Sequence, residues 1–453
     1  MLLTLLISLL MLYTPVPAGD PTFPWQWSLL GVLALAGVNA VACWVGTGAA
    51  ARCCAAGAGW EDMRAVRILR ALNFGIVGFV LLDVFALQWP ATADVLCHVI
   101  RFEWGTVPVL PDLVLLAPAL LMIGTAMAFD HRFERAVGRM GLSLRQYLSL
   151  RFRTELAVLL APWLLLALVS GIARILWGRS ENFGLIDALL SLAVLLTIVT
   201  LGAGLLRLVW QTSSLAPGPL RDRLDALCRR EGFRCRDILV WHTYNHLPNA
   251  AVVGIVPQLR YVLLTDALLA NCTDEEVEAV FAHEVGHIRR HHLGFYMVFA
   301  LAFVCFYVNI VDMLGAGGWV EPVGDMVTNE FATHQAIVML VFAALYWVFV
   351  FGFFSRRLEQ QADLFSARTS SDPGAFVTAL RKLSALGGTP SKAGSWRHFS
   401  IARRTGFLEA AAADPDLGRR SERQVRVMQV VVLVLFAAAL LRLALRLPQW
   451  MGT

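Results

Sequence analysis

Charged side chains are scarce in this chain of 453 residues, of which only 16% are Asp, Glu, Lys or Arg. A soluble globular domain carries about 25%, whereas here 58% of the residues are hydrophobic and the mean hydropathy is +0.64. This composition excludes a soluble globular protein and indicates an integral membrane protein. Loop arginines account for the net charge of +5, so the charge predicts no nucleic-acid partner.

Long apolar runs are abundant. A spanning helix needs about 20 mostly apolar residues, and eight stretches meet this requirement: Trp27–Ala50, Leu69–Gln88, Val107–Phe129, Leu156–Trp177, Leu185–Val209, Gly294–Leu314, Ala336–Phe354 and Val427–Leu445. A weaker ninth, residues 1–13, lacks a basic start and a clear small-residue cleavage site. We therefore expect an uncleaved span there, with a signal peptide as the alternative.

The distribution of arginines among the loops predicts the orientation of these spans, because Lys and Arg are retained on the cytoplasmic side. The segment Ala51–Arg70 contains four arginines and Asp130–Arg153 contains six, whereas the alternate loops are nearly bare. Nine spans then place two long polar segments, Gln211–Leu293 and Ser355–Arg426, in the cytoplasm. The sequence thus predicts a multi-pass protein of the cell's inner (plasma) membrane.

Paired cysteines and reactive clusters are both lacking in the N-terminal half. The eight cysteines of the chain form no CxxC pair, and under this topology only Cys97 lies outside. We expect reduced thiols and no disulfide framework. The residues before about Trp210 contain no cluster of His, Cys, Asp or Glu, so they indicate no recognisable chemistry.

The first polar segment has the pattern of a small mixed domain. An amphipathic helix is expected after Gly218, followed by short strands in "RDILVWHT", "NAAVVGIV" and "QLRYVLLTD". The strand "RYVLLT" is expected to offer its edge to an extended peptide. Such binding uses main-chain hydrogen bonds, so we expect little selectivity for the peptide's sequence. Thr273 and Glu276 then form a capping box that begins a helix with apolar periodicity.

Four of the ten histidines lie within "HEVGHIRRHH", on that helix and at its end. His283 and His287 are one turn apart, about 6 Å along the axis, so both rings project from one face. Two imidazoles at this spacing suit a tetrahedral zinc ion, and Glu284 is placed to deprotonate a water molecule. This is the HExxH arrangement. The alternative is a pair of satisfied surface histidines, and His291 and His292 are expected to be interfacial.

A third ligand would distinguish a zinc site from a pair of surface histidines, because catalytic zinc needs three protein ligands. The second polar segment supplies a candidate in "SRRLEQQADLFSA", where Glu359 and Asp363 are four residues apart and share a helix face. Glu359 would complete the set, and Asp363 would accept a hydrogen bond from the other ring nitrogen of a ligand histidine. The alternative is a solvated pair bound to Arg356 or Arg357.

These two motifs together resemble the membrane-bound zinc endopeptidase family that contains bacterial HtpX and the CAAX prenyl endopeptidases. The family pattern is HExxH followed, after a helical hairpin, by ExxxD. The resemblance covers about Arg221 to Leu408 and includes "PNAAVVG", "LRYVLLTDALL" and "RHFSIARR". Phe399 stands where the family usually has proline, and the long N-terminal array exceeds the family's minimal four-span form.

The resemblance implies one zinc ion per chain and a role for eight residues. They are His283, His287 and Glu359 as ligands, Glu284 as the base, Asp363 as the support of a ligand ring, Asn249 in substrate binding, and His398 and Arg404 in catalysis.

The implied fold class is a mainly α membrane protein of about nine transmembrane helices. Its cytoplasmic gluzincin-type zinc peptidase domain contains a small β-sheet and is split by a transmembrane helical hairpin. The expected division is an N-terminal array (1–210), a first peptidase part (211–293), the hairpin (294–354), a second peptidase part (355–426) and a C-terminal span with its tail (427–453).

The predicted function is that of an integral-membrane zinc metalloendopeptidase. At helical rise, both motifs lie about 8 to 11 Å from the membrane edge. The expected partners are therefore the lipid bilayer and a membrane-associated protein or peptide, cleaved at the cytoplasmic face. The sequence leaves the oligomeric state open.

Two alternatives remain open. A BlaR-type sensor-transducer protease is favoured by the long N-terminal array and disfavoured by the absence of a sizeable external domain. The other is a catalytically silent membrane scaffold or transporter, whose zinc site would be structural or vestigial. Transport would need ionisable residues within spans, and the candidates are few: Asp83 and Asp187, with Asp312 near a span end.

Overall fold

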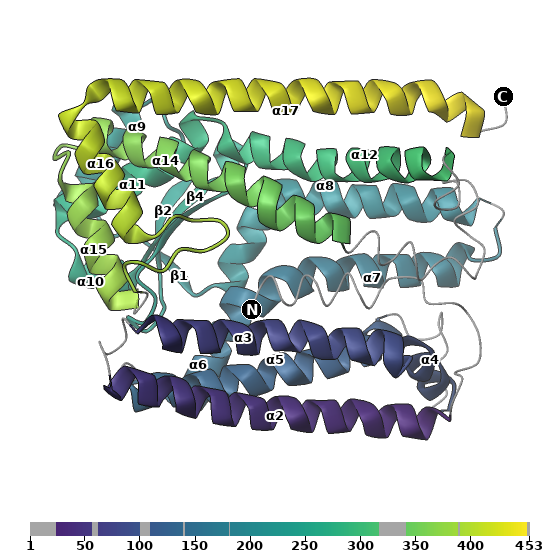
Figure 1. Cartoon of the computed structure of the whole chain (residues 1–453). Coiled ribbons are helices and arrows are strands. Elements are labelled where there is room, and N and C mark those ends of the chain that lie inside the picture. The colour runs from purple at the N-terminus through teal and green to yellow at the C-terminus, as the bar shows by residue number, and fades with distance from the viewer. Residues whose placement is uncertain are drawn as a thin grey trace. The chain divides into compact units, whose positions relative to one another are not determined.

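The structure is a computed structural model that describes residues 24–56, 62–99, 109–138, 141–180, 182–316, 341–387 and 390–450. The chain divides into two compact units, Met1–Thr212 and Ser213–Thr453. Helices make up most of both units, and the short strands follow the last helix of the first (Figure 1). The predicted mainly helical fold class with a small sheet is confirmed.

The first unit consists of apolar helices. They are α2(Trp25–Ala56), α3(Met63–Leu81), α4(Trp89–Val99), α5(Leu110–Ala136), α6(Leu144–Arg151), α7(Ala157–Trp177) and α8(Phe183–Val209), with π-helical turns η2(Leu82–Ala86) and η3(Phe152–Leu156). Large apolar side chains such as Leu30, Leu33 and Val41 are exposed on the outside. Lipid is the solvent that such surfaces suit.

Buried polar side chains in this unit bond to backbone oxygens of neighbouring helices. Asn39 of α2 donates from Nδ2 to the carbonyl oxygen of Met122 at 3.2 Å. The indole Nε1 of Trp89 donates to Leu115 O at 2.9 Å. Because an unpaired polar group within a bilayer is costly, these bonds fix α2 and α4 against α5.

Seven helices of the described residues are long and apolar enough to cross a membrane, or eight with a bent pair counted as one span. The bent pair is Phe183–Ile198 and Thr200–Arg207, which meet at 58°. Each of the eight predicted stretches overlaps one of these helices. The ninth predicted span, residues 1–13, lies outside the described residues.

A four-stranded sheet with the order β1-β2-β4-β3 precedes the histidine helix. Its strands are β1(Thr212–Ser214), β2(Asp237–Trp241), β3(Ala250–Val253) and β4(Tyr261–Thr265). Leu263 of β4 pairs with Leu239 of parallel β2 on one side and with Ala251 of antiparallel β3 on the other. The prediction that "RYVLLT" offers an edge is therefore wrong, because β4 is paired on both sides and β3 forms the edge. β1 has no counterpart in the prediction.

The helices of the second unit include the predicted histidine helix. They are α9(Pro219–Arg230), α10(Asp266–Asn271), α11(Asp274–Arg289), α12(His292–Ala316), α14(Gly352–Thr369), α15(Ala375–Gly387), α16(Ile401–Ala413) and α17(Pro415–Trp450), with 3-10 turn η4(Pro257–Leu259) and π-helix η6(Leu345–Phe351). The predicted capping box of α11 is confirmed: the Glu276 N–H donates to Thr273 Oγ1 at 3.3 Å, and the Thr273 N–H donates to Glu276 Oε2 at 2.9 Å.

α11 lies in the core of this unit and packs closely against α14. Its Phe281 is fully buried in a cluster that contains Ile238 and Leu264 of the sheet and Phe376 of α15. At Gly286, a Cβ atom would lie 3.1 to 3.2 Å from side-chain carbons of Phe365. The missing side chain at residue 286 thus lets the two helices approach.

The membrane-spanning part of this unit is joined by aromatic side chains. Phe295 and Phe299 of α12 pack with Tyr346 and Phe351 of η6. The Tyr346 hydroxyl donates to Phe299 O at 2.8 Å. These contacts hold the helix that follows α11 beside the helix that continues into α14.

Replacing Gly286 with valine should lower the thermal unfolding temperature in detergent, because the new side chain would be forced against Phe365. Overpacking of this kind costs about 1 to 3 kcal/mol. Gly406→Ala is the control, since a Cβ at Gly406 of α16 meets no atom within 4 Å. An unchanged unfolding temperature for Gly286→Val would show that the α11–α14 contact tolerates a side chain.

Candidate metal centre

His283 and His287 direct their Nε2 atoms toward one point. The two atoms are 3.3 Å apart, and the ring planes are nearly perpendicular at 83°. His283 stacks on Phe376, with ring centroids 5.1 Å apart and planes at 19°. The HExxH helix therefore holds two converging nitrogen ligands on a packed, apolar support.

Glu359 of α14 completes the convergence. Its Oε2 lies 3.6 Å from His283 Nε2, and its Oε1 lies 3.6 Å from His287 Nε2. The three side chains offer ligand atoms that all lie within 4.8 Å of one another. Two nitrogens and one carboxylate oxygen are a donor set that suits zinc. The residues that the sequence selected thus fit a metal ion.

Asp363 and Arg404 support the first of these rings. Oδ1 of Asp363 lies 3.1 Å from Nδ1 of His283. Arg404 donates to the same carboxylate twice, from Nε to Oδ2 at 2.9 Å and from Nη2 to Oδ1 at 2.6 Å. Asp363 is fully buried and Arg404 nearly so. A carboxylate on the far nitrogen fixes the orientation of a ligand ring.

His292 and Gln361 support the second ring. Nδ1 of His292 lies 2.9 Å from Nδ1 of His287, and Nε2 of His292 lies 3.0 Å from Oε1 of Gln361. If His292 donates to this amide oxygen, its Nδ1 accepts the proton of His287 Nδ1. Nε2 of His287 is then left with a free lone pair.

The prediction that His292 is interfacial is wrong, because its side chain is fully buried. The helix pattern could not reveal this contact, since α11 ends at Arg289 and α12 begins at His292. Between them, His291 has a φ of 57°. This turn redirects the chain and brings His292 back to His287.

The ionisation of these groups reflects burial and the nearby carboxylates. Burial lowers the pKa of His287 to about 3, so its ring is neutral. Burial also acts to lower the pKa of His283, but hydrogen bonds with Asp363 and Glu359 outweigh it and raise the pKa to about 9. The surroundings thus favour positive charge at this point, as a bound cation would supply.

Glu284 faces the same pocket from α11 but lies beside the metal cluster. Its Oε2 accepts a hydrogen bond from the Val252 N–H of edge strand β3 at 3.1 Å. Burial raises the pKa of its carboxyl to about 7. A carboxyl group with this pKa can both take up and release a proton near neutral pH.

One pocket of about 460 Å³ gathers most of the predicted site residues. Its lining includes His283, Glu284, His287, Glu359, Asn249, His398 and Arg404. Asn249 lies just before β3, and its N–H donates to Thr265 Oγ1 at 2.9 Å. Nδ1 of His398 lies 3.2 Å from Glu359 Oε2, and its side chain is 45% exposed. Asp363 does not line this pocket but contacts His283 through the ring's Nδ1 atom.

Phe399, which departs from the family pattern, has a packing role here. The guanidinium of Arg403 lies 3.9 Å from its ring centroid, and those of Arg356 and Arg357 lie 5.7 and 5.9 Å away. These cation–π contacts stabilise the loop that carries His398.

Comparison with known proteins gives relatives of one kind. Residues 219–441 match the family model described as "Peptidase family M48". "Protease HtpX homolog" of Aeropyrum pernix is 27% identical over 207 residues, which cover 44% of this chain and 62% of the relative. "Protease HtpX" of Legionella pneumophila (strain Corby) is 30% identical over 151 residues, 31% of this chain and 49% of the relative. The chain spans about half the length of the curated relatives it matches.

The fold likeness extends further than the sequence likeness. The crystal structure of S. mikatae Ste24p matches with a TM-score of 0.51 and 18% identity, over 86% of this chain and 99% of that one. The shared fold therefore reaches beyond the second unit into the N-terminal array, so a long array is no departure from the fold. The M48 match and the HtpX relatives place residues 219–441 in the membrane metallopeptidase family of HtpX, and the likeness to Ste24p shows a shared fold.

Proposed function

We propose that this protein is an integral-membrane zinc metalloendopeptidase. The observation that carries the proposal is the convergence of His283, His287 and Glu359, with Glu284 beside them, in a pocket bordered by an edge strand. A bound zinc ion would act as a Lewis acid on the scissile carbonyl and lower the pKa of a water molecule.

The protein's own groups supply the proton transfers and the positioning. Glu284 takes the proton of the attacking water and delivers it to the leaving amine, in keeping with its pKa of about 7. His398 is exposed at the pocket wall and donates to the oxyanion. Arg404 is engaged by Asp363, so we assign it to holding His283 in place.

The substrate is proposed to bind as an extended strand beside β3. Asn249 and the strand residues Ala250, Ala251 and Val252 line the pocket, and among the described strands β3 is paired with β4 alone. Main-chain bonding along an edge strand requires no particular side chain. We therefore propose loose specificity, with Asn249 contacting the substrate backbone.

The site is proposed to act at the cytoplasmic face of the inner (plasma) membrane on membrane or membrane-tethered proteins. The arginine-rich loops of the sequence support this orientation. α11 is followed within three residues by the spanning helix that begins at His292, and Glu359 lies on the helix Val341–Thr369 that also qualifies as a span. These connections support a metal centre close to the membrane. The five-part division given by the sequence belongs to this proposal.

Glu284→Gln should retain bound zinc while slowing cleavage of an unfolded membrane protein by about 10² to 10⁴-fold, the contribution of a general base. Zinc is measured by elemental analysis of the detergent-purified protein, and cleavage by gel electrophoresis. Glu275→Gln, on the same helix outside the pocket, is the matched control. Full cleavage by Glu284→Gln would remove this residue from the mechanism.

Glu359→Ala should release zinc together with activity, because two histidines alone do not complete the three-ligand set. Chelation of the wild type should give the same inactive state, and added zinc should restore the wild type only. A variant that holds one zinc ion per chain would contradict the ligand role of Glu359.

His292→Leu should weaken zinc binding about 10- to 100-fold, as loss of a supporting hydrogen bond to a ligand does. Competition with a zinc-binding dye measures this affinity independently of activity. His291→Asn is the matched control, because asparagine tolerates the positive φ of this exposed position. Equal zinc affinity for both variants would refute the role of His292.

A further inference from the structure

A groove between α14 and α17 is lined by arginines toward one end and by large apolar side chains toward the other. It has a volume of about 580 Å³ and is lined by Phe353, Arg357, Arg420, Arg423, Gln424, Val427 and Met428. Three of these residues are arginines and three are large and apolar. No acidic residue lines the groove within the described part of the chain.

The order of these residues along the two helices creates the separation. On α17, Arg420, Arg423 and Val427 follow at helical spacing along one face, from the charged start of the helix into its apolar part. On α14, Phe353 precedes Arg357 by four residues, as the helix leaves its apolar part. Both helices therefore place apolar side chains at the membrane end and arginines at the other end.

The arginines of α17 have no counter-charge in the described residues. The neighbouring Glu422 points elsewhere, since it pairs with Arg290 at 2.8 Å and with Arg368 at 3.0 Å. No ion pair of Arg420 or Arg423 occurs in the described ranges, and both residues are exposed. Two uncompensated cations thus face the groove.

We propose that this groove binds an anionic phospholipid, with the phosphate at the arginines and an acyl chain on Phe353, Val427 and Met428. Basic pockets between spanning helices favour such headgroups because charge and apolar contact act together. A free phosphate would leave the apolar half of the groove without a partner. The side-chain chemistry therefore selects the lipid.

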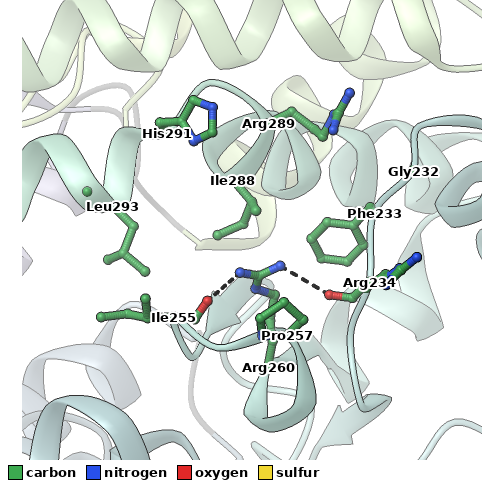
Figure 2. A pocket seen from close by; sticks show the side chains of 11 residues that line it. Gly232, Phe233, Arg234, Ile255, Pro257, Arg260, Ile288, Arg289, His291 and Leu293 are labelled. Atoms are coloured by element: carbon green, nitrogen blue, oxygen red, sulfur yellow. Dashed lines mark hydrogen bonds between the residues drawn. The ribbon is translucent and has the colours of Figure 1, made fainter.

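A second basic pocket, of about 370 Å³, shows what distinguishes the groove. Its central cation is Arg260, whose guanidinium donates to the carbonyl oxygens of Arg234 and Ile255 (Figure 2). The same guanidinium also donates to the carbonyl oxygen of Gly254 at 3.1 Å. Figure 2 also shows the guanidinium groups of Arg234 and Arg289 directed away from Arg260. Arg260 therefore ties two loops together, and this pocket provides the control variants.

The groove adjoins the metal centre through α14, since Arg357 precedes Glu359 by two residues. A lipid that bridges Arg357 to Arg420 and Arg423 would hold α14 against α17 close to the metal ligand Glu359. Any effect on proteolysis rests on the proposed function, whereas lipid binding does not.

The test is native mass spectrometry of the full-length protein in detergent, titrated with phosphatidylglycerol or with phosphatidylcholine of the same chains. The wild type should bind phosphatidylglycerol in preference. Arg420→Gln and Arg423→Gln should each weaken this binding about fivefold, and the double variant about 25-fold, because a basic residue near an anionic headgroup contributes about this much. The double variant Arg234→Gln/Arg289→Gln should bind as the wild type does.

Three results would overturn the proposal. The wild type could bind both lipids equally, or the α17 variants could bind phosphatidylglycerol as tightly as the wild type does. The third is displacement of the lipid by an equimolar amount of inorganic phosphate. If the α17 double variant does not fold, the two single variants decide. Their zinc content, measured in parallel, shows whether the metal centre is intact, so a failure of the groove is distinguished from a failure of the proposed function.

Discussion

The contact between α11 and α14 is the constraint on which the site depends. His283 and His287 belong to one helix and Glu359 to the other, and the ligand set exists only while the two stay packed. The bare Cα of Gly286 meets Phe365, and Ser366 donates to the carbonyl oxygen of Ala279 at 2.6 Å. Close approach and a buried hydrogen bond thus fix the distance from which three ligand atoms converge.

Charge balance is the second requirement of this interface. Glu359, Asp363 and Arg404 are buried together with His283, and groups buried in this way must compensate one another. The bidentate pair of Arg404 with Asp363 neutralises one carboxylate, whereas Glu359 faces two imidazoles. A divalent cation would balance the charges of Glu359 and of Glu284, when Glu284 is ionised, in the same pocket. The supporting network therefore serves both the ligand geometry and the stability of the packed helices.

The sequence predicted what is local and missed what depends on distant pairing. HExxH and the spacing of Glu359 and Asp363 are helix-face patterns, so helical periodicity reveals them. The edge of the sheet is different, since β3 and β4 are both largely apolar and only the pairing order decides which strand lies at the edge. His292 was missed because a turn interrupts the periodicity. Arg404 came from family resemblance alone, and its contact with Asp363 spans 41 residues.

Glu359 lies on one continuous helix, Val341–Thr369, which includes η6 and α14, whereas the two histidines lie on a helix outside the apolar region. Bilayers of different thickness change the tilt of a spanning rod, and a tilt about the embedded end shifts its far end sideways. The packing of Gly286 on Phe365 and the hydrogen bond from Ser366 to Ala279 oppose such a shift and keep the carboxylate beside the two rings. Acyl-chain length in the host membrane thus sets a load that the contact between α11 and α14 has to resist.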